Sequence, residues 1–263
     1  HVSDLLRHFR RTDDVIVIHP EDSRRLVAQR FSGGIRERRT FWCLTGFAPS
    51  LRWTMGLIAD WWPVDLLHVH HLEGLDLSVV RPMRDRGIPV IYSLHDARFA
   101  GDYSLLLARN APQAAVEGAR RRWERRERRE MRQIARFVSP SAYLGNLLRT
   151  IDPTMNARCV MIPHGCDAPS ARRTPSVRGA VCFLGTVHAE DKGRSLVAAA
   201  ALRLAGRGRR VVLLGTAASH MPSALHAHPL IVFRGFYARE DLPRLLEEED
   251  VAVCCLPSTI PEG

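Results

Sequence analysis

The chain alternates short runs of apolar residues with longer stretches in which apolar side chains recur at helical spacing. In its first part, apolar runs of strand length predict strands at residues 14–19, 40–47, 66–71, 89–96, 137–141 and 160–163, the first of them buried. Helical periodicity predicts helices at residues 1–9, 51–62, 75–86, 112–135 and 142–151, the last with Ser141 as its N-cap, while 99–110 is predicted to be irregular or partly helical. Strands and helices that alternate in this way are typical of an α/β fold with a doubly wound parallel sheet.

The same alternation returns nearer the C-terminus, with predicted strands at 180–184, 210–214, 230–233 and 250–256 and helices at 194–204 and 242–249. Between the two parts, residues 167–178 are polar, contain Pro169 and Pro175, and show no periodicity. The sequence therefore predicts two domains, residues 1–168 and 179–263, joined by a linker over 169–178.

The stretch that follows the strand at 180–184 carries the clearest candidate chemistry. Gly185 and Thr186 end the strand, and Lys192 and Gly193 open the next helix. A glycine turn, a lysine and a helix N-terminus favour an anion, because free backbone N–H groups and the helix dipole both attract negative charge. The spacing matches neither G-x-G-x-x-G nor G-x-x-x-x-G-K-[ST], so by itself it also suits an ordinary βαβ unit with a surface lysine.

Six stretches give this loop a context. They lie, in order along the chain, at residues 65–71, 137–141, 160–167, 180–193, 233–246 and 250–263. In content and order they resemble family 4 glycosyltransferases, which have the GT-B fold. The resemblance covers nearly the whole chain.

The resemblance implies two Rossmann-like domains, each with a doubly wound parallel sheet, that face a cleft. It also implies an enzyme that moves a sugar, with retention, from a nucleotide-sugar donor to a saccharide or lipid-linked acceptor, as in polysaccharide biosynthesis. Family members have a glycine-rich loop before the helix predicted at 1–9 and a second glutamate eight residues after Glu262. Both domains are therefore expected to be incomplete, and these 263 residues alone to show little or no transfer. The alternative within the fold is another GT-B enzyme, such as a sugar-nucleotide 2-epimerase.

In the first domain, two predicted strands end in histidines, at the edge where parallel sheets bind ligands. His95 resembles the family histidine that lies near the transferred sugar, so it is the catalytic candidate, although a histidine there can equally satisfy a loop carbonyl. His70, His71 and Asp96 are candidates for the acceptor side of the cleft. Since His70 and His71 are consecutive in a strand, one is expected to face the cleft and the other to pack.

In the second domain, the resemblance implies that Gly185, Thr186, Lys192 and Gly193 bind the donor, with Lys192 as a point charge on the diphosphate. Glu262 resembles the first family glutamate, which lies beside the transferred sugar, so it is the second catalytic candidate.

The sequence departs from the family pattern at Thr186, where family members commonly have an arginine. A threonine can donate one hydrogen bond, but the diphosphate loses a cation. His188 or Arg194 is expected to compensate for the lost cation. The departure at Thr186 puts the affinity for the donor in doubt, but not the fold.

The net charge of +10 is concentrated between Arg120 and Arg132, where eight arginines stand against three glutamates. A solvated helix face with pairs such as Glu124–Arg128 is one interpretation. Trp123 among these arginines also suits a helix on an anionic membrane surface. Nucleic acid ranks last, because no recognition motif accompanies the charge. An inactive chain that binds membrane or RNA through this helix is the non-enzyme alternative.

The remaining composition points to the cytoplasm. The six cysteines contain no C-x-x-C pair, and Cys182, Cys254 and Cys255 fall in runs that predict buried strands, so a reducing compartment fits. No apolar stretch approaches the ~20 residues of a membrane span, and residues 1–9 lack the apolar core of a signal peptide. Twelve histidines without an H-E-x-x-H spacing are weak support for a metal, so no metal and no cofactor is expected, the nucleotide sugar being a substrate.

Overall fold

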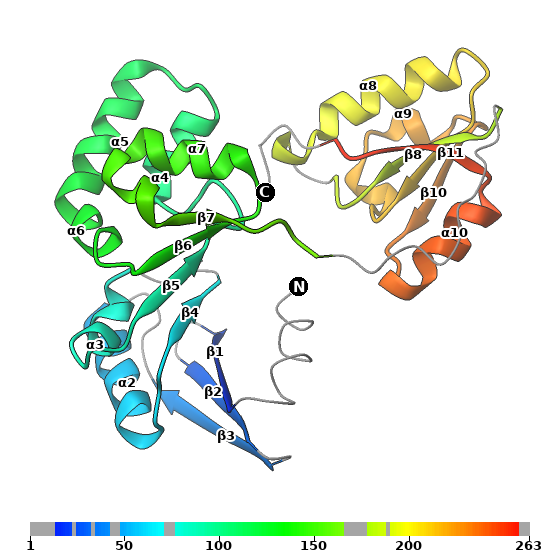
Figure 1. The fold of residues 1–263 in the computed structure, drawn as a ribbon. Helices are drawn as coiled ribbons and strands as arrows, with labels where there is room; N and C mark the ends of the chain where they lie inside the picture. Colours follow the sequence, from blue (N-terminus) through cyan, green and yellow to red (C-terminus); the bar gives the residue numbers. More distant parts are fainter. Residues whose placement is uncertain are drawn as a thin grey trace. The chain divides into compact units, whose positions relative to one another are not determined.

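The computed structural model describes residues 14–22, 25–32, 35–42, 48–70, 77–165, 178–187 and 190–257 (Figure 1). The chain divides into two compact units, here called unit 1, which ends at His164, and unit 2, which begins at Gly165. The predicted linker lies, except for Arg178, outside the described residues. Its boundaries, and the cleft expected between the domains, stay predictions.

Unit 1 contains a four-stranded parallel sheet in the order of the sequence. Its strands are β4 (Leu67–Val69), β5 (Val90–Ser93), β6 (Arg136–Ser139) and β7 (Cys159–Met161). Tyr92 in β5 lies opposite Val69 in β4 and Phe137 in β6, and all three side chains are buried. The predicted parallel sheet is confirmed, with strands shorter than predicted.

Helices pack around this sheet. They are α2 (Ala48–Trp61), the 3₁₀ helix η1 (Leu77–Val80), α3 (Arg81–Arg84), α4 (Gly101–Ala108), α5 (Gln113–Arg126), α6 (Arg128–Met131), α7 (Ala142–Ile151) and the 3₁₀ helix η2 (Pro153–Arg158). Ser141 caps α7 as predicted, because its side chain accepts a hydrogen bond from the Leu144 N–H. The predicted long helix over 112–135 is interrupted at Glu127, and the stretch predicted to be irregular contains α4.

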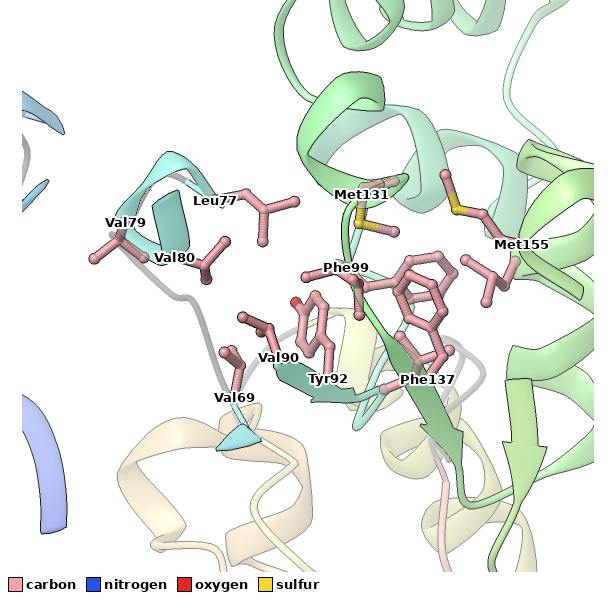
Figure 2. Packing of buried hydrophobic residues seen from close by; sticks show 14 of the residues in the cluster. Val69, Leu77, Val79, Val80, Val90, Tyr92, Phe99, Met131, Phe137 and Met155 are labelled. Carbon is pink, nitrogen blue, oxygen red and sulfur yellow. The ribbon is translucent and has the colours of Figure 1, made fainter. Parts of the chain in front are cut away.

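The core of unit 1 lies between the sheet and these helices. Figure 2 shows the Tyr92 and Phe137 rings beside Phe99, Met131 and Met155. The two rings are 6.4 Å apart and tilted by 40°, a geometry that aromatic pairs favour. Since Phe137 is fully buried, its truncation to alanine is expected to cost about 3–5 kcal/mol.

A second, antiparallel sheet precedes the parallel one and was not predicted. It is formed by β1 (Val15–Asp22), β2 (Arg25–Ser32) and β3 (Ile35–Trp42), in that order. The predicted strand at 14–19 exists as β1, but as an edge strand it is only half-buried. Among the side chains of this sheet that the structure describes, the buried ones are in β2: Leu26, Val27 and Ala28. The strand predicted at 40–47 overlaps only the end of β3, and residues 43–47 lie outside the described residues.

Two members of the arginine run hold elements of unit 1 together. Arg128 and Arg132 donate to the buried carboxylate of Asp152 at 3.0 and 2.9 Å. Burial raises the pKa of Asp152, but hydrogen bonds from Thr154, Arg132 and Arg128 outweigh it and leave the pKa below its ordinary value. Those arginines therefore connect the two ends of α6 to Asp152, the N-cap residue of η2.

The run also forms helix-surface pairs: Arg120 pairs with Glu117 and Glu124, and Arg128 forms the predicted pair with Glu124 at 3.4 Å. Trp123, however, is only 4% exposed and packs against Tyr103 with ring centroids 5.6 Å apart. The premise that Trp123 accompanies the arginines at the surface is therefore wrong. The periodicity of α5 places this indole on its inward face.

Unit 2 is a second parallel α/β unit. Its strands are β8 (Ala180–Leu184), β9 (Val211–Leu214), β10 (Ile231–Gly235) and β11 (Val251–Cys255), in the spatial order β10-β9-β8-β11. Its helices are η3 (Glu190–Lys192), α8 (Arg194–Ala205), η4 (Ala218–His220), α9 (Ser223–His226), η5 (Arg239–Asp241) and α10 (Leu242–Glu248). Val212 packs with α10 residues on one face of the sheet and Leu213 with α8 residues on the other, so this sheet is doubly wound as predicted.

The cysteines of unit 2 only partly follow the prediction. Cys182 in β8 is fully buried, whereas Cys255 is half-buried and Cys254 is exposed. The difference arises because, among the described residues, β11 pairs only with β8, whereas Cys182 in β8 lies between β9 and β11.

Candidate active site

The carboxyl ends of the parallel strands in unit 1 bring histidines together. His70 directly follows β4 and His95 lies two residues after β5. Their side chains share a hydrogen bond of 3.0 Å between His70 Nδ1 and His95 Nε2. The ring of His164, three residues after β7, stacks on His95 with centroids 5.6 Å apart and planes 8° apart. His68 tilts against His70 at 4.0 Å and lies 2.9 Å from the Ser93 hydroxyl. We call these four side chains the histidine row.

The histidine row has a defined charge state at its centre. Burial, with the charges that His68 and His95 can carry, lowers the pKa of His70 to about 4. His70 is therefore neutral near pH 7 and has one donor and one acceptor nitrogen. The hydrogen bond between the two side chains engages Nε2 of His95. A second-shell contact fixes the tautomer of a functional histidine in the same way.

Asp96 and His71 are the other candidates of unit 1. Asp96 accepts a hydrogen bond of 2.7 Å from the Arg98 backbone N–H, so it shapes the loop after β5. His71 lies outside the described residues. Of these two consecutive histidines, His70 is the one with a described contact to His95.

The strand order of unit 2 marks the place where a ligand is expected. From β8 the chain continues to β9 on one side, while β11 lies on the other. This reversal is a topological switch point, and doubly wound sheets bind ligands just beyond the carboxyl ends of the strands at such a point. Gly185 and Thr186 lie there, directly after β8.

A buried threonine holds the loop that begins at Gly185. The Thr216 hydroxyl donates to the Gly185 carbonyl at 2.8 Å and accepts from the Val187 N–H at 2.9 Å. At Gly215, where φ is +91°, an added Cβ would lie 3.0 Å from the Gly185 carbonyl, so the two backbones pack directly against each other. The backbone of Thr186 is thereby fixed between Gly185 and Val187, while its side chain is exposed.

The start of α8 is equally constrained. Gly193 is the N-cap residue with φ of +79°, and a Cβ there would approach the Pro257 carbonyl oxygen to 2.2 Å. Only glycine fits, because both the backbone conformation and the space exclude a side chain. Half-buried Lys192 precedes it at the end of η3. The four candidate donor residues therefore lie in unit 2, at or next to constrained backbone. They are Gly185, Thr186, Lys192 and Gly193.

The N-terminus of α8 already carries an anion from the chain itself. Glu190 accepts hydrogen bonds from the Ser195 N–H at 3.3 Å, the Ser195 hydroxyl at 2.9 Å and Arg194 Nε at 3.1 Å. The hydrogen bond from the Ser195 hydroxyl keeps the pKa of Glu190 below its ordinary value, so this carboxyl is charged near neutral pH. Arg194 was expected to compensate for the missing arginine at position 186, but here it pairs with Glu190. His188 and Glu262 lie outside the described residues.

Two negative findings concern the part of the chain that the structure describes. No group of three or more His, Cys, Asp or Glu side chains there has a geometry that could hold a metal ion. Among the same residues, no helix combines the length and apolar character that crossing a membrane requires.

Residues 1–168 match the family model described as Glycosyltransferase Family 4. The chain belongs to this family. A search of curated proteins finds no match for the chain.

Solved structures similar to this family 4 chain include the catalytic domain of starch synthase IV from Arabidopsis thaliana bound to ADP and acarbose. It is 14% identical, with a TM-score of 0.52 over 93% of this chain and 66% of that chain. UDP-GlcNAc 2-epimerase from Neisseria meningitidis also matches, with 10% identity and a TM-score of 0.45 over 79% of this chain and 58% of that chain. UGT2 from Phytolacca americana matches with 16% identity and a TM-score of 0.42 over 77% of this chain and 54% of that chain. The chain therefore spans no more than 66% of these chains. The starch synthase match shows the fold, a GT-B-like α/β architecture.

Sequence reasoning missed three residues of the candidate site. His164 and Thr216 each follow a strand closely, so the rule that identified His70 and His95 could have found them. Glu190 had no such indication, because its contact with α8 depends on how η3 folds back on the helix.

Proposed function

We propose that this protein transfers a sugar, with retention, from a nucleotide-sugar donor to a saccharide or lipid-linked acceptor. Membership of Glycosyltransferase Family 4 over residues 1–168 carries the proposal. The switch point at the end of β8, beside a helix N-terminus and a lysine, supports donor binding by unit 2. The ADP in the starch synthase IV structure is consistent with a nucleotide donor.

In this proposal, unit 2 holds the donor diphosphate. Lys192 supplies the positive charge, and Thr186 donates one hydrogen bond from the loop that Thr216 holds. As the diphosphate leaves, its growing negative charge is stabilised by Lys192 and by the dipole of α8. Glu190 opposes this, since its carboxylate occupies the first turn of α8. It must move aside or share that turn with the donor.

Unit 1 contributes His95 near the transferred sugar, and Glu262 acts beside the same sugar. The acceptor attacks from the side of the leaving group. His70 orients the His95 imidazole through their shared hydrogen bond, so it is a positioning residue and not a catalytic one.

The test uses an unusual feature of the composition: Lys192 is the chain's single lysine. Acylation of Lys192 by an amine-reactive reagent, followed by mass spectrometry, is expected to slow in the presence of nucleoside diphosphates and their sugars. Lys192→Ala should weaken donor binding about tenfold, because one charge-assisted contact is lost. Arg207→Ala, which removes an exposed cation after α8, is the matched control and should bind donor as the parent does.

Equal acylation rates with and without every nucleotide sugar tested, together with unchanged binding by Lys192→Ala, would contradict the donor site. Donor binding without transfer, and with interconversion of the donor sugar at C2, would instead favour the epimerase alternative.

A further inference from the structure

Two cysteines lie beside each other in the sheet of unit 2. Cys182 in β8 and Cys254 in β11 are register partners in a parallel ladder, and Figure 1 shows the two strands next to each other. Neighbouring strands lie about 4.8 Å apart, which is within the range of about 4.4–6.8 Å between the α-carbons of a disulfide. Register partners also place their side chains on the same face of a sheet. The backbone therefore brings both thiols to one place.

The two thiols are in contact. Both are free cysteines, and the Cys182 thiol donates a hydrogen bond to the Cys254 sulfur. Cys182 packs with Val212 and Leu214 on the face of the sheet that α10 covers. Cys255 packs with the apolar cluster on the other face, because side chains alternate along a strand. The partner of Cys182 is therefore Cys254.

The two thiols differ in their access to solvent. Cys182 is 0% exposed, whereas Cys254 is exposed. Burial raises the pKa of the Cys182 thiol to about 12, so this thiol stays protonated near neutral pH and is a poor first nucleophile. A small molecule in solution can reach Cys254. An accessible thiol with a second thiol against it is the arrangement of a redox-sensitive cysteine and its resolving partner.

We propose that Cys182 and Cys254 form a reversible disulfide that locks β11 to β8 when small-molecule disulfides, such as glutathione disulfide, accumulate. Cys254 Sγ attacks one sulfur of glutathione disulfide, so that the S–S bond breaks and one glutathione leaves. Cys182 Sγ then attacks Cys254 Sγ in the mixed disulfide and releases the second glutathione. The two protons of the cysteine thiols pass to the two leaving thiolates, so two thiols are oxidised and one glutathione disulfide is reduced.

The cross-link would hold both halves of one end of unit 2. Cys182 lies three residues before Gly185, and Cys254 lies three residues before Pro257, whose carbonyl oxygen closes the space at Gly193. Among the described residues, β11 is held in the sheet by its ladder with β8 alone. A covalent bond there also closes a long loop, which lowers the entropy of the unfolded chain. The inference does not depend on the proposed transfer reaction, because thiol oxidation is measured without a sugar donor.

The experiment is peptide mapping of the 263-residue chain after incubation with an excess of glutathione disulfide. Free thiols are blocked with iodoacetamide in denaturant, and the protein is digested with trypsin without a reductant. Trypsin cuts after Arg178, Lys192 and Arg244, so Cys182 and Cys254 fall in different peptides. We expect residues 179–192 to be linked to residues 245–263, and dithiothreitol to separate them. Because partial burial also raises the pKa of the Cys254 thiol, the exchange should be slow near neutral pH.

Three variants assign the bond. Cys254→Ser should abolish the linked peptide. Cys182→Ala should leave one glutathione on Cys254, because the thiol that would displace it is gone. Cys255→Ser is the matched control from the same strand, and it should form the linked peptide as the parent does.

The melting temperature measures the lock itself. The oxidised parent should melt about 5–10 °C above the reduced parent, because the closed loop destabilises the unfolded chain. The same oxidant should leave the melting temperature of Cys254→Ser unchanged within about 1 °C. Reduced Cys254→Ser should melt as the reduced parent does, since its side chain is exposed.

The proposal is overturned if the parent accumulates glutathione on Cys254 and no linked peptide forms. A linked peptide that Cys255→Ser abolishes and Cys254→Ser retains would contradict the assignment to Cys254. A disulfide between Cys182 and Cys254 that leaves the melting temperature of the parent unchanged would show that the bond does not lock β11.

Discussion

Replacing Thr216 with valine should loosen the loop after β8 without leaving a cavity. Valine has nearly the shape of threonine, so the change removes the hydroxyl and little else. Two hydrogen bonds disappear, one to the Gly185 carbonyl and one from the Val187 N–H. Because Thr216 and Val187 are 0% and 2% exposed, water cannot take the hydroxyl's place.

The expected cost follows from these contacts. Each hydrogen bond contributes roughly 1 kcal/mol, and a buried N–H left without a partner costs about 1–3 kcal/mol. Thr216→Val should therefore lower the free energy of unfolding of unit 2 by about 2–4 kcal/mol. For a unit of this size that corresponds to a fall in melting temperature of about 10–20 °C. Circular dichroism melts and urea titrations measure the two quantities independently.

Two matched substitutions isolate the hydroxyl. Thr216→Ser keeps both hydrogen bonds and should recover most of the stability. Thr186→Val makes the same chemical change on an exposed side chain of the same loop, so its effect on unfolding should stay within about 0.5 kcal/mol. For nucleotide binding we expect the larger loss from Thr186→Val, because it removes a proposed direct contact, whereas Thr216→Val acts only through the loop. A Thr216→Val protein as stable as the parent would refute the reasoning.

Three further substitutions have defined outcomes. Gly193→Ala should destabilise unit 2 by roughly 2–5 kcal/mol in urea titrations, since positive φ and the approach to Pro257 both oppose a Cβ. Asp152→Asn should destabilise unit 1 by about 3 kcal/mol, and the parent's matching stability should be present above pH 4 and lost as pH falls through the depressed pKa of Asp152. The parent's melting temperature should fall as the pH drops from 6.5 to about 4, because His70 takes up its proton near pH 6.5 when unfolded but has a pKa of about 4 when folded. His70→Gln should make this fall smaller.

Each of these has a control of the same chemistry. Gly208 has φ of +75° and open space around it, so Gly208→Ala should cost only about 1 kcal/mol. Asp102→Asn removes an exposed carboxylate, and His220→Gln an exposed imidazole. If any control matches its partner variant, the specific contact assigned to that partner is not the cause of the effect.

The parallel strands were predictable because burial on both faces leaves a plain apolar run. Residues 211–214 read Val-Val-Leu-Leu, and all four are fully buried in β9. Strand β3 shows the opposite case. Its centre, residues 36–39, is Arg-Glu-Arg-Arg, which has no apolar alternation, so its pairing with β2 determines the strand and its composition does not.

The site was predictable to the level of the sheet edge. Since parallel strands end at the same edge, residues after β4 and β5 had to be neighbours, and His70 and His95 are. The choice of Nδ1 and Nε2, the stacking of His164 and the capping of α8 by Glu190 depend on rotamers and loop paths. Hydrophobic periodicity contains no information on either.

Charge density was the weakest guide to function in this chain. The buried carboxylates Glu130 and Asp152 engage four arginines, two of them, Arg81 and Arg84, from outside the run at 120–132. A buried carboxylate must be paired to be tolerated, so these arginines are retained for packing whatever the partner of the protein is. A basic run therefore indicates a binding surface only after such pairs are subtracted.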